Sequence, residues 1–158
     1  MDTVVRKQTL RMLSNGLYVL TSCSGDRYGA ATVSWLSQAS FKPPLLMAAV
    51  RPDSNVFKCL SESGVAAVHI LGRDQQEMAQ KFFAPTRVCG DTLNGEPFVH
   101  GATQAPILTN ARAYCECLVR HSCSLGDHTV VLMEVVAAEC RAVTSPLTVA
   151  ASPWQYGG

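Results

Sequence analysis

The sequence predicts a mainly β protein, an antiparallel barrel that is closed or nearly closed and carries a few flanking helices. About seven short apolar or alternating segments are separated by turn signals rich in Gly, Pro, Asn and Asp, which is typical of barrels. Only about two or three segments have helical spacing. The 158 residues are 47% hydrophobic and 16% charged, with a net charge of +1, so we expect one folded domain with a substantial core.

The N-terminal part of the chain predicts one helix and then three strands. We expect, in order, a short opening helix over residues 3–14, a strand over 17–23, a hairpin turn at 24–27, a strand over 28–35 that runs into a polar loop, and a strand over 45–50. Pro43 and Pro44 end the polar loop. The third strand is a continuous apolar run between Pro44 and Pro52, which is the pattern of a fully buried strand.

A capped helix and a second buried strand are expected next. Ser54 precedes the helical segment 55–63 as its N-terminal cap, and Gly64 closes it. The strand is the apolar run over residues 65–71.

Another helix is expected after Asp74, which would cap it, and Pro85 would end it. Four apolar residues share one face of this helix: Met78, Ala79, Phe82 and Phe83. Residues 84–105 are predicted to be a long irregular stretch, and loops of this size in compact domains are usually functional.

The C-terminal part predicts further strands. We expect a strand over residues 106–120 with a turn near Thr109 and Asn110, a turn at 122–127, a long Val-rich strand over 128–138, and a short strand near 147–150. Residues 1–151 are expected to form the domain and residues 152–158 a C-terminal tail.

The segment from Gly29 to Pro44 is the most informative one for function. Small and hydroxyl-bearing residues crowd it: Ala30, Ala31, Thr32, Ser34, Ser37, Ala39 and Ser40. Small residues let a flat ligand approach the backbone, and hydroxyls with free loop N–H groups can hold its polar edge and a phosphate. The alternative is an ordinary Ser-rich turn after an edge strand.

Charged residues and histidines offer further candidates. Gly126-Asp127-His128 is a tight turn that brings a histidine to the rim of a strand, where it meets a ligand or, alternatively, faces solvent. His69 lies in an apolar run and is expected to be a core histidine. A phosphate-bearing ligand would want cations, and the alternative for each is a solvated surface charge: Arg51, Lys81 and Arg87.

Other sites and locations receive little support. No short segment gathers Lys and Arg, no apolar run has the length of a membrane span, and the N-terminus lacks a signal-peptide core, so neither nucleic acid nor a membrane is expected as a partner. No Gly-x-Gly-x-x-Gly motif follows a strand, which leaves a Rossmann site unsupported. The seven cysteines are interpreted as mostly reduced thiols of a cytoplasmic protein.

A zinc site and a nucleophilic cysteine are the two alternatives to this interpretation. Cys115, Cys117, Cys123 and His128 are poorly spaced for zinc, and no metal is expected. A nucleophilic cysteine needs a neighbouring base, and only Cys89, in the long loop, merits a check.

An ordered set of motifs resembles one family. The set comprises Gly16-Leu-Tyr-Val-Leu-Thr21, Ser34-Trp-Leu-Ser-Gln-Ala-Ser-Phe-Lys-Pro-Pro44, residues 64–71 and 106–108, Ala113-Tyr-Cys-Glu-Cys117 and Gly126-Asp-His128. Over nearly its whole length the chain resembles the flavin reductase-like domains. In detail it looks most like the domain at the C-terminus of cyanobacterial diflavin flavodiiron proteins, and it is also similar to flavoredoxin and to the flavin domain of high-molecular-weight rubredoxin. The resemblance implies the FMN-binding split barrel, an antiparallel Greek-key β barrel.

The resemblance also implies a site for FMN, or the closely related FAD, at a homodimer interface. It places the flavin ring against Thr32, Val33, Ser34 and Trp35, with Ala48, Ala49 and Val50 opposite. It places the phosphate at Ser37, Gln38, Ala39 and Ser40, helped by Arg51. Ser54 and the region Lys81–Pro85, which includes Phe83, would complete the pocket. His128, the expected catalytic residue, would lie near the flavin face where nicotinamide stacks.

The chain departs from the family pattern in three places. Family members often have Asn where Ser34 stands, so a side-chain bond to the ring is expected to differ. Ala39 replaces a frequent Val with little expected effect. The loop from Ala84 to Gly95 matches poorly, which leaves its phosphate or dimer contacts open.

The implied activity is hydride transfer from NADH or NADPH to FMN, with electrons passing to a second flavin or to a flavodiiron, rubredoxin-like or monooxygenase acceptor. Backbone N–H groups near residues 34–39 would stabilise negative charge on the reduced ring. The alternative is an FMN-binding electron-transfer module, like flavoredoxin, without nicotinamide activity of its own. A third class, heme or pyridoxal-phosphate split-barrel proteins, would be distinguished by an absorption spectrum.

Overall fold

The protein is mainly β, as predicted, with three helices among its strands. The structure, a computed structural model, describes residues 1–158. Its elements are α1 (Thr3–Arg11), β1 (Tyr18–Ser24), β2 (Arg27–Val33), β3 (Leu36–Ser40), β4 (Leu45–Val50), α2 (Asn55–Ser63), β5 (Val65–Ile70), α3 (Gln76–Lys81), β6 (Val88–Cys89), β7 (Thr92–Leu93), β8 (Glu96–His100), β9 (Pro106–Leu108), β10 (Ala113–Ser124) and β11 (Thr129–Cys140).

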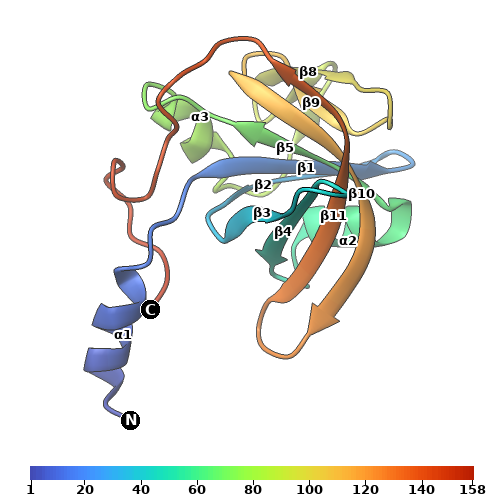
Figure 1. The fold of residues 1–158 in the computed structure, drawn as a ribbon. Coiled ribbons are helices and arrows are strands. Elements are labelled where there is room, and N and C mark those ends of the chain that lie inside the picture. Colours follow the sequence, from blue (N-terminus) through green and yellow to red (C-terminus); the bar gives the residue numbers. More distant parts are fainter.

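Seven strands form one antiparallel sheet, in the order β2-β1-β5-β10-β11-β4-β3. β10 and β11 form a long curved pair (Figure 1). The edge strands are β2 and β3, yet the chain passes from one to the other through only Ser34 and Trp35. The two edges of the curled sheet therefore lie close together at this crossing without pairing with each other.

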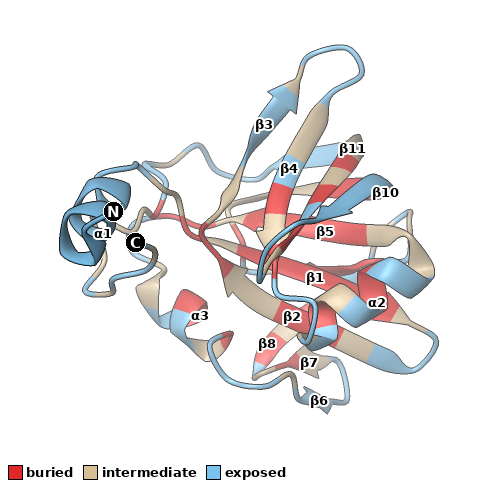
Figure 2. Cartoon of the chain, turned by 90° about the horizontal axis from the view of Figure 1, so that it is seen from below, coloured by how far each residue is buried: buried red, intermediate tan, exposed pale blue.

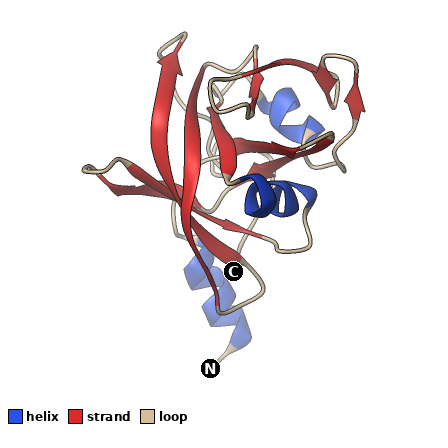
Figure 3. Ribbon diagram, turned by 90° about the vertical axis from the view of Figure 1, so that its right-hand side faces the viewer, coloured by secondary structure: helices blue, strands red, loops and turns tan.

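Smaller elements surround this sheet. A second sheet has the order β6-β7-β8-β9, and α2 packs against β1 and β2. Figure 3 shows the strands as the body of the molecule, with the N-terminal helix apart from them. That helix, α1, has no buried residue. None of the helices combines the length and the apolar character that spanning a membrane requires.

The apolar side chains form two main clusters. One cluster of 11 buried residues includes Leu20, Leu60 and Met133 and joins α2 to the large sheet. A second cluster of 12 buried residues includes Phe82 and Leu108 and lies between α3, the small sheet and the C-terminal segment. Burial of such apolar side chains is the dominant favourable contribution to folding.

The predicted ends of α2 are confirmed in detail. The Ser54 hydroxyl accepts a hydrogen bond from the Phe57 amide at 3.2 Å, which satisfies one free donor of the first helical turn. Gly64 ends the helix in the left-handed conformation with φ 72°, which glycine adopts without a steric cost. Ser54 is thereby fixed at a helix N-terminus, which matters for the site described below.

The predicted polar loop after β2 is wrong, because residues 36–40 form the edge strand β3. β3 pairs with β4, and this hairpin projects from the body of the molecule with most of β3 exposed (Figure 2). A run of serines with one flanking proline pair is compatible with a loop or with a solvated edge strand, since edge strands are often polar. β4 is correspondingly only partly buried, in contrast to the expected fully buried strand, and its Met47 is exposed.

Residues 84–105 are also more regular than expected. They contain β6, β7 and β8, which are too short to give a recognisable period in the sequence. Near the other end of the chain, β10 continues to Ser124, so the predicted turn over 122–127 is shorter. The segment 147–150 makes only an isolated bridge, from Thr148 to Gly16.

The start and the buried face of α3 differ from the prediction. The residue before α3 is Gln75, and Asp74 instead pairs with Arg112 at 2.6 Å. Phe82 is buried, whereas Phe83 is 51% exposed, because α3 ends at Lys81 before the helical period can bring Phe83 to the core.

His69 is a core histidine, as predicted. It is fully buried, its Nδ1 donates to the Val19 carbonyl at 3.0 Å, and its Nε2 accepts from the Leu108 amide at 2.9 Å. Burial lowers the pKa of His69 to about 4, although the bond to Val19 acts in the opposite direction. The ring therefore stays neutral and links three segments, β1, β5 and β9.

Candidate functional site

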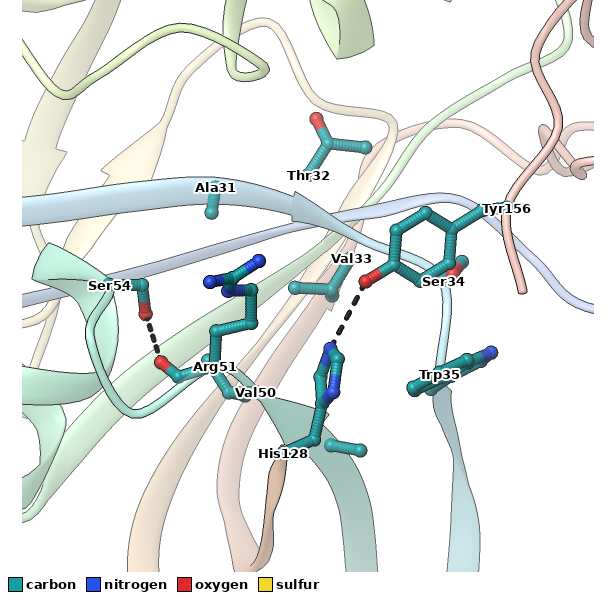
Figure 4. Close-up of a pocket in the computed structure, with 11 residues that line it drawn as sticks. Ala31, Thr32, Val33, Ser34, Trp35, Val50, Arg51, Ser54, His128 and Tyr156 are labelled. Carbon is teal, nitrogen blue, oxygen red and sulfur yellow. Dashed lines mark hydrogen bonds between the residues drawn. The ribbon is translucent and has the colours of Figure 1, made fainter. Parts of the chain in front are cut away.

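A pocket of about 140 Å³ opens where the chain crosses from β2 to β3 (Figure 4). One wall is the end of β2 and the crossing, residues 31–35. The opposite wall is the end of β4 with the following loop, residues 49–51 and 54. His128, the residue just before β11, and Tyr156, from the C-terminal segment, complete the lining.

The crossing, which lines this pocket, carries hydrogen-bonding groups without a protein partner. The Ser34 hydroxyl is buried and has no hydrogen-bond partner. The backbone N–H groups of Ser34 and Trp35 also donate no hydrogen bond to another backbone group, because both residues lie between the paired strands. Buried polar groups are nearly always paired in native proteins, so this combination indicates a polar ligand edge at the crossing.

His128 is held in the pocket by three neighbours. Its Nδ1 lies 2.8 Å from Asp127 Oδ1, and its Nε2 lies 3.1 Å from the hydroxyl of Tyr156. The ring of Trp35 lies 4.7 Å from the imidazole, centroid to centroid. The hydrogen bond from His128 lowers the pKa of the Asp127 carboxyl, which therefore stays ionised and accepts from Nδ1.

Arg51 supplies positive charge at the opposite wall. Its guanidinium makes two bonds to Asp53, at 3.1 and 3.0 Å, and hydrogen bonding to Arg51 lowers the pKa of Asp53. This pair is exposed, so both side chains can exchange it for another partner. The Ser54 hydroxyl donates to the Arg51 carbonyl at 2.7 Å, which fixes the loop at the N-terminus of α2. A cation beside a helix N-terminus is a favourable place for an anion.

Nine of the residues expected from the sequence line this one pocket: Thr32, Val33, Ser34, Trp35, Ala49, Val50, Arg51, Ser54 and His128. The hydroxyl of Thr32 is already used, since it donates to the Ala79 carbonyl at 2.6 Å. This bond ties the end of β2 to α3 and keeps the wall in place.

The remaining expected residues lie elsewhere. Ser37, Gln38, Ala39 and Ser40 are on β3, outside the lining of this pocket. Phe83 lines a neighbouring hollow that shares Ala31 and Ser54 with the pocket. Lys81 lines a further hollow with Arg87 and pairs with Glu96 at 2.8 Å.

Tyr156 belongs to the predicted C-terminal tail and is a pocket residue that the sequence does not predict. Tyr156 contacts Trp35, with ring centroids 5.2 Å apart, as well as His128. One weak signal was available in the sequence. A solvated tail seldom carries two aromatic residues, and this one has Trp154 and Tyr156.

Sequence comparisons identify relatives of the chain. The family model described as "Flavin reductase like domain" matches residues 10–153. Diflavin flavoprotein A 1 of Synechocystis sp. is 32% identical over 130 residues, which are 82% of this chain and 23% of that protein. The chain thus spans about a quarter of the length of that relative. A flavin reductase (NADH) of Kitasatospora aureofaciens is 34% identical over 139 residues, 85% of this chain and 71% of that protein.

Solved structures are similar over nearly the whole chain. The crystal structure of BorF, the flavin reductase component of a bacterial two-component tryptophan halogenase, is 25% identical. Its TM-score is 0.77, and the match covers 92% of this chain and 91% of that one.

Proposed function

The chain belongs to the flavin reductase-like domain family, and we propose that it reduces a bound flavin with NADH or NADPH and passes the electrons to an acceptor. The observation that carries this proposal is the buried, unpartnered Ser34 hydroxyl beside the free amides of the β2–β3 crossing, in one pocket with His128. The relative from Kitasatospora aureofaciens, a flavin reductase (NADH), supports the same reaction class.

The lining residues fit a flavin. We propose that the small residues Ala31 and Ala49 leave room for the flat ring, and that Ser34 and the neighbouring amides bond its polar edge. Arg51 and the N-terminus of α2 at Ser54 are the proposed phosphate site. Ser37, Gln38, Ala39, Ser40, Lys81 and Phe83 stay as predicted contacts, which the exposed β3 and the adjoining hollows could supply in the assembled protein.

The flavin and the protein residues have different proposed roles in the reaction. The flavin, when bound, supplies the hydride-accepting and electron-storing chemistry. His128 orients the nicotinamide ring, because its own orientation is fixed by Asp127 and Tyr156. Trp35 packs beside the imidazole, with the two ring planes tilted by 57°. We propose that the free amides of the crossing place positive partial charge beside the pocket, which favours an anionic ring.

Assembly, cofactor and location complete the proposal. We propose FMN as the flavin and a homodimer as the assembly. We also propose a cytoplasmic location, because all seven cysteines are free thiols.

Exposed apolar residues support a contact with a second copy. They lie on and next to the β3–β4 hairpin and on β11, and include Phe41, Met47 and Val130. A flavodiiron, rubredoxin-like or monooxygenase-type protein is the proposed acceptor. One structural relative, BorF, is likewise the flavin reductase component of a two-component enzyme, a tryptophan halogenase.

An anaerobic mixing experiment tests the activity. The purified protein, loaded with FMN, is mixed with NADH and separately with NADPH, and the flavin absorbance near 450 nm is followed. We expect the yellow colour to disappear within the turnover time of a reductase, on the order of a second or less. Colour that persists with both nucleotides but is lost with a protein electron donor would instead establish the electron-transfer module. Failure to bind either FMN or FAD would exclude both functions.

Ser34→Ala should have opposite effects on stability and on flavin binding. Removing an unpartnered buried hydroxyl should stabilise the flavin-free protein by about 1 kcal/mol, because its desolvation cost disappears. The same change should weaken FMN binding about tenfold, the equivalent of about 1.4 kcal/mol. Urea unfolding and fluorescence titration measure the two quantities.

Ser22→Ala is the matched control for that variant. Ser22 is also buried, but its hydroxyl donates to the Val65 carbonyl at 2.7 Å. The control should therefore lose stability and keep its FMN affinity. If Ser34→Ala also loses stability and binds FMN normally, Ser34 is not a flavin contact.

A further inference from the structure

The last seven residues, 152–158, form a strap that runs from the domain to α1 (Figure 1). The strap is attached at several points along its length. The ring of Trp154 meets that of Phe83 edge to face, with centroids 4.7 Å apart. Arg11 Nε of α1 donates to the Gly157 carbonyl at 3.1 Å. Between these two attachments, Tyr156 lies in the pocket beside His128 and Trp35 (Figure 4).

The hydrogen bonds around His128 define which groups donate. The Asp127 carboxylate can only accept, so Nδ1 of His128 carries a proton and donates to it. In the tautomer whose single proton lies on Nδ1, Nε2 is an acceptor, and the Tyr156 hydroxyl donates to it across 3.1 Å. The two hydrogen bonds hold the two nitrogens of the imidazole, and the ring of Trp35 packs against it.

Packing does not explain why Tyr156 is held there. The residue is 48% exposed and belongs to neither main apolar cluster. Its defined contacts are the hydrogen bond to His128, the ring of Trp35 and the pocket wall. Tyr156 also lies beyond residues 10–153, the part of the chain that matches the family model.

We propose that Tyr156 is a positioning residue for His128, delivered to the pocket by the strap. This inference rests on the proposed function, in which His128 orients the nicotinamide ring. Without the Tyr156 hydroxyl, only the highly exposed Asp127 side chain would hold the imidazole by a hydrogen bond. A loosely held ring presents the nucleotide in a productive orientation less often, and misplacement by about 1 Å costs up to ~100-fold in rate.

The experiment uses Tyr156→Phe, which keeps the ring and removes only the hydroxyl. With saturating FMN and no oxygen, stopped-flow absorbance should show the limiting rate of flavin reduction by NADH falling about tenfold. The NADH concentration for half-maximal rate should change by less than about twofold, since binding is not the step affected. The FMN dissociation constant, from fluorescence titration, should stay unchanged.

Tyr28→Phe is the matched control. Tyr28 also makes a hydrogen bond between its hydroxyl and a histidine Nε2, that of His100, at 3.0 Å and outside the pocket. Its removal should leave all three quantities at the wild-type values. If both variants slow reduction equally, the effect is structural and Tyr156 has no special role.

A nitrogen-15 NMR spectrum of the imidazoles provides a readout that needs neither flavin nor NADH. In Tyr156→Phe the Nε2 resonance of His128 should move downfield, toward that of a free acceptor nitrogen, while the other three histidines keep their shifts. The His128 resonances are assigned by their absence in His128→Asn. An unchanged Nε2 resonance would overturn the proposal even if the protein proved not to oxidise NADH. If His128→Ala slows reduction and Tyr156→Phe does not, the proposed function stands and only this inference fails.

Discussion

His128→Ala is expected to slow anaerobic reduction of the bound flavin by NADH about 100-fold. The imidazole is fixed at the pocket by Asp127 and Tyr156, and an oriented side chain that handles a proton or holds a reacting ring typically contributes ~100-fold or more. Flavin affinity should change little, because the proposed flavin contacts are Ser34, the amides of the crossing and Arg51 rather than His128. Stopped-flow absorbance gives the rate, and fluorescence titration gives the affinity.

His121→Ala is the control for this prediction. His121 is exposed on β10, outside the pocket lining, so reduction should proceed at the wild-type rate. A His128→Ala protein that is reduced at the normal rate would show that nicotinamide is oriented by other groups. A protein that loses flavin and activity together would reassign His128 to flavin binding.

Arg51→Ala is expected to weaken FMN binding about 30-fold and to leave riboflavin binding unchanged. Riboflavin has the same ring as FMN without the phosphate, so the difference between the two ligands isolates the phosphate contact. A hydrogen-bonded charge pair contributes about 2 kcal/mol, which corresponds to about 30-fold in affinity. Arg51 can supply it because its bond to Asp53 is solvent-exposed and exchangeable. Fluorescence titrations with both ligands measure the effect.

Arg120→Ala serves as the surface-charge control. Arg120 pairs with Glu134 on the long hairpin and lines no part of the pocket. This variant should bind FMN and riboflavin as the wild type does. Equal losses of FMN and riboflavin in Arg51→Ala would mean that Arg51 supports the ring or the fold, and the phosphate would then be sought at Ser37, Ser40 or Lys81.

Much of the fold followed from local rules. The cap at Ser54, the glycine at the end of α2 and the apolar run of β5 each obey a short-range rule with few competing outcomes. The small-residue segment indicated the pocket wall at Thr32 to Trp35 for a physical reason, since a ligand site needs bare backbone. The family itself was recognised from the order of motifs, which is a stronger signal than any one of them.

The errors have a common physical origin in long-range pairing. Residues 37–40 have the composition of a loop, and only the partner strand β4 turns them into β3. Asp74 has the right type and position for a cap but finds Arg112, 38 residues away, as a stronger partner. Tyr156 meets His128 across 28 residues, and no pattern within either segment encodes that contact.

The buried histidine of β5 has a consequence for behaviour in acid. An unfolded chain binds a proton at His69 below about pH 6.5, whereas the folded protein resists it until about pH 4. The free energy of unfolding is therefore unaffected by His69 above pH 6.5. It falls by about 3 kcal/mol as the pH is lowered from 6.5 toward 4, because the unfolded chain binds the proton first. Urea unfolding at pH 7 and pH 5 should reveal the loss, and a His69→Gln variant should show a weaker pH dependence. Mild acidification would thus weaken the whole fold through one residue at its centre, which ties β1, β5 and β9 together.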